Sequence, residues 1–141
     1  MRIDRWAACA MGLTLLLSLP GCAGSRATTD PTPVQVTDIA SVAGRWAGLL
    51  EIAGSRDRED YVEVTIDGNG TYQTKAARTI GVVDTRGTLA VSSGVLVIKG
   101  ESGGRGTAVL HTQPPPDQRL LVVKGTAPDG RAYTMRLRPQ R

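Results

Sequence analysis

The stretch Val62-Glu63-Val64-Thr65-Ile66-Asp67-Gly68-Asn69-Gly70-Thr71-Tyr72-Gln73-Thr74-Lys75 sets the fold class of this chain. Every second residue from Val62 to Ile66 is apolar, which is the period of a strand that is buried on one face. The sequence Asp67-Gly68-Asn69-Gly70 follows, and its glycines and asparagine accept the positive φ angles of tight turns. Alternation resumes over residues 72–75. The stretch therefore predicts an antiparallel hairpin.

The same alternation recurs on both sides of this hairpin. Trp46, Gly48, Leu50 and Ile52 share one face of residues 45–53. We expect further strands at 87–91, 95–99, 106–112, 119–127 and 131–138. Turns rich in glycine, proline and serine separate these segments. About eight strands result, with no helix after the N-terminal apolar run. We expect an all-β fold, an antiparallel up-and-down meander that forms a small lipocalin-like β-barrel.

The dipeptide Gly-Thr repeats along the chain at Gly70, Gly87, Gly106 and Gly125, with a spacing of 17 to 19 residues. One hairpin with its turns has about this length, so the repeat favours a meander of hairpins. Eight such strands can close into a barrel, which removes exposed strand edges. An open sandwich is the alternative.

The sequence Gly44-Arg45-Trp46-Ala47-Gly48 opens the first of these strands. A Gly-x-Trp motif at this position of a small antiparallel barrel resembles lipocalins and, more loosely, avidin-like proteins. In those families the tryptophan packs across the base of the barrel, so the resemblance implies this role for Trp46. An eight-stranded barrel is either filled by its own side chains or holds one small ligand. Both states stay open at this point.

The N-terminal region has the order of an export signal. Arg2 and Arg5 precede an apolar run over residues 7–19, and small residues follow. The run has about 13 residues, well short of the roughly 20 that a membrane-spanning helix needs. Its end, Leu19-Pro20-Gly21-Cys22, resembles the lipobox of bacterial lipoproteins. Ordinary secretion, with Gly21-Cys22-Ala23 as a small-x-small cleavage site, is the alternative.

The lipobox resemblance implies cleavage before Cys22, a diacylglycerol on its sulfur and an acyl chain such as palmitate on its amine. Two or three chains anchor a protein stably, because each buried methylene contributes about 0.8 kcal/mol. Ala23 follows where lipoproteins retained at the inner membrane tend to have aspartate. The resemblance therefore implies an outer-membrane protein that faces the periplasm.

Three segments follow from these observations. Residues 1–21 form the lipoprotein signal peptide, and residues 22–42 comprise the lipidated cysteine and a flexible tether rich in Ser, Thr and Pro. Within that tether, residues 35–40 are a candidate for a short first strand. Residues 43–141 form the barrel domain, which is long enough for one modest core.

Composition argues against several classes of function. The formal net charge of +4 is too small to predict a nucleic-acid partner. His111 is the only histidine, and no nucleophile motif accompanies it, so we expect no enzyme. The lipobox resemblance implies that Cys9 leaves with the signal and that Cys22 is modified, so we expect no disulfide and no common zinc site. Asp67 begins a sequence like a calcium loop, but Arg78 stands where the bidentate glutamate is needed. We expect no metal and no cofactor.

Arginines crowd the last predicted strand and the C-terminus, at Arg131, Arg136, Arg138 and Arg141. Guanidinium groups can hold phosphate or carboxylate by paired hydrogen bonds, so these residues form a candidate patch for an anionic partner. A merely solvated face is the alternative.

Together these features predict a cell-envelope lipoprotein that works as a binding module for a small apolar ligand or an envelope protein. The alternatives are a structural or assembly role at the outer membrane, through the outer barrel surface, and inhibition of an enzyme that attacks the envelope.

Overall fold

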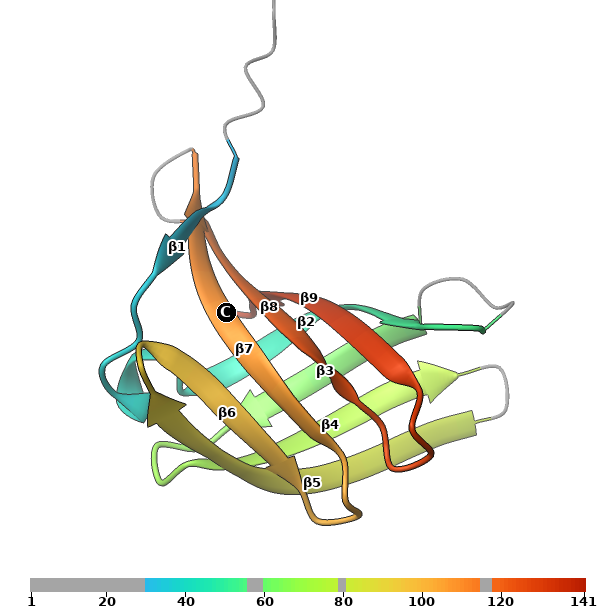
Figure 1. The fold of residues 1–141 in the computed structure, drawn as a ribbon. Coiled ribbons are helices and arrows are strands. Elements are labelled where there is room, and N and C mark those ends of the chain that lie inside the picture. Colours follow the sequence, from blue (N-terminus) through green and yellow to red (C-terminus); the bar gives the residue numbers. More distant parts are fainter. Residues whose placement is uncertain (1–29, 56–59, 79–80, 115–117) are drawn as a thin grey trace, which may run out of the picture.

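The computed structural model describes residues 30–55, 60–78, 81–114 and 118–141, and these residues form an all-β fold (Figure 1). Cys22 and the predicted signal peptide lie outside the described residues. The elements are β1 (Thr32–Val34), η1 (Ile39–Ser41), β2 (Gly44–Ile52), β3 (Asp60–Ile66), β4 (Thr71–Arg78), β5 (Gly81–Ser92), β6 (Val95–Gly100), β7 (Arg105–Gln113), β8 (Gln118–Thr126) and β9 (Ala132–Pro139). Within the described part of the chain, no helix has the length and apolar character needed to span a bilayer.

Strands β2 to β9 form a closed antiparallel up-and-down barrel. Each strand pairs with the next along the chain, and β9 returns to pair with β2, where Leu49 lies opposite Arg136. The meander predicted from alternation is confirmed, and closure replaces the sandwich alternative. Closure leaves none of these eight strands with an open edge, which is the physical advantage of a barrel over an open sheet.

The predicted hairpin is the pair β3 and β4, with Ile66 opposite Tyr72. Its turn holds Gly70 at φ 87°, a conformation that glycine adopts without steric cost. The Asn69 side chain accepts a hydrogen bond from the Thr71 backbone N–H at 2.9 Å. Local turn chemistry and strand alternation therefore agree at this hairpin.

Two strands are longer than their sequence patterns predict. β5 begins at Gly81 rather than at Gly87, and β4 continues to Arg78 rather than ending at Lys75. In the added part of β5, the inward-facing residues are Val83 and Thr85. In β5, the inward-facing Thr85 hides the apolar alternation, so the sequence pattern does not show this end of the strand.

The segment that precedes the barrel also differs from expectation. Residues 35–40 do not form a strand, because η1 is a turn of 3₁₀ helix that Asp38 caps by accepting a hydrogen bond from Ala40 N–H at 3.1 Å. Much of the predicted tether packs on the barrel instead. β1 pairs with β7, and the side chains of Val36 and Val42 are only 2% and 0% exposed.

These N-terminal residues close one end of the barrel around Trp46, which is 2% exposed. Its indole Nε1 donates a hydrogen bond to the Val42 carbonyl oxygen at 2.8 Å. The Arg119 guanidinium lies 5.3 Å from the ring centroid and donates to the Ser41 carbonyl. This cation–π contact and the buried hydrogen bond hold the tryptophan across the barrel base, as the lipocalin resemblance implied.

Candidate functional site

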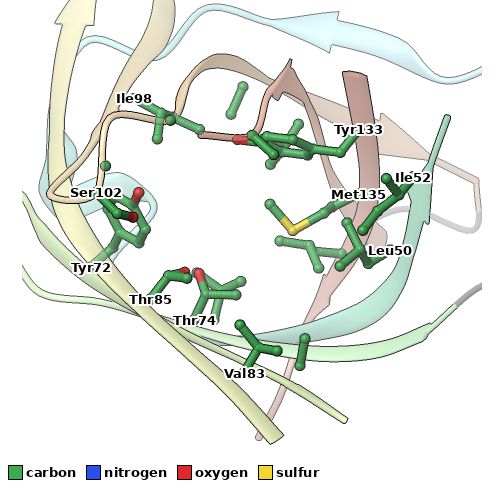
Figure 2. Close-up of a pocket in the computed structure, with 18 of the residues that line it drawn as sticks. Leu50, Ile52, Tyr72, Thr74, Val83, Thr85, Ile98, Ser102, Tyr133 and Met135 are labelled. Atoms are coloured by element: carbon green, nitrogen blue, oxygen red, sulfur yellow. The ribbon is translucent and has the colours of Figure 1, made fainter. Parts of the chain in front are cut away.

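Beyond the closed end the barrel is hollow, with a cavity of about 400 Å³ (Figure 2). Inward-facing residues of all eight barrel strands line it, and the turns at residues 101–104 and 127–131 border its mouth. Trp46, Val36 and Val42 do not line it, because they fill the opposite end. The volume lies within the range of small-molecule sites. The sequence leaves both a filled and a hollow barrel open, and this cavity shows that the barrel is hollow.

Tyr72 lies against two glycines that face into the barrel. It pairs with Gly87 on β5, and Gly87 pairs with Gly100 on β6. A Cβ atom added at Gly87 would lie 2.7 Å from Cε1 of Tyr72, closer than van der Waals contact allows. The ring therefore occupies the space where a side chain on Gly87 would stand.

Tyr133 repeats this arrangement on the other side of the barrel. It pairs with Gly125 on β8, and Gly125 pairs with Gly106 on β7. A Cβ atom added at Gly125 would lie 2.7 Å from Cζ of Tyr133. Three of the four Gly-Thr repeats thus accommodate tyrosine rings, whereas Gly70 serves the β3–β4 turn.

The two phenol groups reach the neighbouring strands β6 and β7. A Cβ at Gly100 would lie 3.5 Å from the Tyr72 hydroxyl, and one at Gly106 would lie 3.1 Å from the Tyr133 hydroxyl. Figure 2 shows Tyr133 pointing its hydroxyl toward the side of the cavity that carries Tyr72 and Ser102. The cavity therefore has one hydroxyl-bearing side within largely apolar walls.

Two threonines extend this polar side. Thr74 on β4 lies opposite Thr85 on β5, and Figure 2 shows the two side by side. Leu50 and Ile52 lie across the cavity from Tyr72. Hydroxyl groups thus interrupt a mainly aliphatic lining, which suits a ligand with one polar group and an apolar remainder.

The hydroxyls of Tyr72, Tyr133, Thr74 and Thr85 make no hydrogen bond to another described residue. Across the described chain, no buried side-chain nitrogen or oxygen lacks a partner. These four hydroxyls must therefore be accessible from the cavity. They are polar groups whose hydrogen bonds are left for cavity contents to make.

Burial also keeps both phenols protonated. It raises the pKa of Tyr72 to about 12, and the nearby Tyr133 and Glu101 act in the same direction. Burial likewise raises the pKa of Tyr133. Both groups therefore remain neutral hydrogen-bond donors throughout the physiological pH range.

The mouth carries an ion pair and an apolar lip. Arg131 Nε donates to Asp129 Oδ2 at 2.7 Å, and this hydrogen bond lowers the pKa of the Asp129 carboxyl. On another part of the rim, Val82 is 73% exposed and Val83, which lines the cavity, is 39% exposed. The entrance combines a neutralised charge pair with aliphatic surface.

The four arginines of the candidate anionic patch do not all gather in one place. Arg131 lies at the cavity mouth and pairs with Asp129. Arg136 and Arg138 are exposed on the outer face of β9, opposite Leu49 and Ala47 of β2. Arg141 is exposed beyond the end of β9, at the closed end. The patch is thus divided between the two ends of β9.

His111 lies on β7 and does not line the cavity. Its Nδ1 atom is 3.4 Å from the Pro31 carbonyl oxygen, so the ring lies beside the segment that leads into β1. Within the described ranges, no three His, Cys, Asp or Glu side chains gather where they could hold a metal ion.

Sequence reasoning placed Tyr72, Tyr133 and Thr74 on strands but did not identify them as site residues. Strand register would identify them, since pairing sets Gly87 opposite Tyr72 and Gly125 opposite Tyr133, but alternation alone does not give that register. Comparison of the chain with models of protein families, with curated proteins and with solved structures finds no match.

Proposed function

We propose that this protein is a lipid-anchored binding protein of the bacterial cell envelope and that its barrel holds one small, mainly apolar ligand. The observation that carries the proposal is the cavity of about 400 Å³ in a barrel whose other end is fully packed. Its walls are mainly aliphatic and carry a few hydroxyl groups. A concave, mostly apolar site with few polar groups is typical of small-molecule binding.

The energetics favour an apolar ligand. Each methylene that leaves water for such a site contributes about 0.8 kcal/mol. The site is already formed by paired strands, so little ordering of the protein opposes binding. Val83 on the rim gives an apolar ligand a path from the entrance to the interior.

The path of the chain supports the anchored arrangement. β1 joins the barrel beside the last residues of β7, where Thr32 lies opposite Thr112, and η1 then covers the closed end. The mouth is bordered by the turns at the other ends of the strands. A tether from Cys22 would therefore join the barrel near its closed end and would not have to cross the mouth.

Ligand binding is tested with N-phenyl-naphthylamine, a neutral probe whose fluorescence rises in apolar surroundings, titrated into the purified protein without detergent. We expect saturable binding with one site per molecule. Thr85→Trp fills the cavity and should abolish this binding. Thr88→Trp is the matched control, because Thr88 is exposed on the outer face of the same strand.

Two results would contradict ligand binding. One is the absence of saturable binding by a protein with native circular dichroism. The other is equal binding by the Thr85 and Thr88 variants, which would put the probe on the outer surface and favour a surface role.

Anchoring is tested separately by the intact mass of the membrane-extracted protein. A chain that begins at Cys22 and carries acyl mass supports the proposal. An unacylated chain that begins at Gly24 contradicts it and indicates ordinary secretion.

A further inference from the structure

We infer that the ligand carries an uncharged oxygen that accepts hydrogen bonds, such as a ketone or ester carbonyl, and that Tyr72 and Tyr133 hold this oxygen together. The inference rests on the proposed function and specifies the class of ligand. The geometry of the two tyrosines and the charges around them support this class of ligand.

Both hydrogen-bond donors, the hydroxyls of Tyr72 and Tyr133, are fixed in place before a ligand arrives. Each tyrosine ring lies against an inward-facing glycine of the neighbouring strand, Tyr72 on Gly87 and Tyr133 on Gly125. Any side chain at these glycines would occupy the same space as the ring. Because the rings are packed, forming hydrogen bonds to a ligand costs little additional side-chain entropy.

The two hydroxyls can donate hydrogen bonds to one acceptor oxygen. They approach Gly100 on β6 and Gly106 on β7, which are neighbouring strands, and Tyr133 raises the pKa of Tyr72. Neither makes a hydrogen bond to another described residue. A carbonyl oxygen has two lone pairs and can accept from both phenols at once.

The surroundings of the two phenols disfavour a charged group on the ligand. Among the described residues that line the cavity, the charged side chains are Asp129 and Arg131, and these pair with each other at the mouth. Glu101 is the acidic side chain that acts on the Tyr72 phenol, and it raises the pKa of that group. A carboxylate there would lose its hydration without gaining a cation, and an ammonium group would lose its hydration as well.

The test compares three ligands of equal carbon number: methyl octyl ketone, decane and decanoic acid at neutral pH. Affinities come from displacement of N-phenyl-naphthylamine. Each affinity is measured for three proteins: the wild type, the double variant Tyr72→Phe with Tyr133→Phe, and the control Tyr61→Phe. Tyr61 is 49% exposed on the outside of β3, so its hydroxyl cannot contact the cavity contents.

We expect the double variant to bind methyl octyl ketone about tenfold more weakly, because two neutral hydrogen bonds are lost. Decane affinity should change by less than about twofold, since phenylalanine keeps the ring packing and the cavity walls. The Tyr61 variant should match the wild type for every ligand. Decanoate should bind wild type at least about tenfold more weakly than the ketone.

The outcomes separate the inference from the proposed function. If ketone and decane bind but the double variant retains full ketone affinity, the tyrosine site is wrong while the hollow barrel still binds ligands. Tighter binding of decanoate than of the ketone overturns the uncharged class. If no ligand displaces the probe and the probe itself does not bind, the proposed function fails. Circular dichroism of the double variant establishes that its fold is unchanged.

Discussion

The two ends of this barrel are built from the same eight strands, yet one is packed and the other is hollow. At the closed end Trp46 and Leu110 are 2% and 5% exposed, and Val36 and Val42 are added from outside the barrel strands. At the open end glycines face inward, and the tyrosines beside them lie flat on the wall. Alternation determines which residues face inward. Side-chain size and added segments determine whether the interior is filled.

Trp46→Ala should have the largest effect, because it removes the side chain that closes the base. We expect the free energy of unfolding to fall by about 3–5 kcal/mol, as for other large-to-small core substitutions. Urea denaturation followed by circular dichroism measures this without relying on tryptophan fluorescence. A loss below about 1 kcal/mol would mean that the closed end is not the main source of stability.

A matched leucine pair compares the two ends directly. Leu110→Ala at the packed end should cost about 2–5 kcal/mol, because it leaves a new void among buried neighbours. Leu50→Ala on the cavity wall should cost less than half as much, since Leu50 is only partly buried and already faces open space. Denaturation midpoints at constant m-value test this. Equal costs would contradict the contrast between the ends.

Gly87→Ala should disturb the packing of the Tyr72 ring against residue 87. The added methyl group would lie 2.1 Å from the Lys99 carbonyl oxygen and 2.7 Å from the tyrosine ring, so strands or ring must shift. We expect a destabilisation of about 1–3 kcal/mol. Gly68→Ala is the control, because nothing lies within 4 Å of an added Cβ there. Its cost should stay within about 0.5 kcal/mol, and similar costs at both sites would contradict the ring-on-glycine packing.

The smallest effect concerns alkaline pH. An unfolded tyrosine ionises near pH 10, whereas burial raises the pKa of folded Tyr72 to about 12. The folded state therefore holds this proton more tightly, and its contribution to stability is complete below about pH 10 and lost as pH rises through about 12. Tyr72→Phe should flatten the fall of the unfolding free energy over that window. Identical pH profiles would show that Tyr72 is not buried as described.

Sequence patterns predicted the frame of the molecule better than its interior. The β3–β4 hairpin and the base position of Trp46 follow from local alternation, turn chemistry and one motif, and these predictions are confirmed. The packing of residues 31–42 was missed, because β1 and η1 gain their stability from distant β7 and from the barrel base rather than from their own sequence.

The cavity could not be predicted because it depends on strand register. Gly87 leaves room for the Tyr72 ring only because strand pairing sets the two residues opposite each other. The same holds for Gly125 and Tyr133. Alternation alone does not set that register. The division of the arginines has the same origin, since β9 carries Arg131 to the mouth and Arg138 toward the closed end.

A crystal structure of the protein grown with methyl octyl ketone tests the central claim most directly. We predict one ketone inside the barrel, with its chain along Leu50 and Ile52 and its oxygen between the hydroxyls of Tyr72 and Tyr133. A barrel whose interior is filled by its own side chains, or a ketone bound only on the outer surface, would contradict the account.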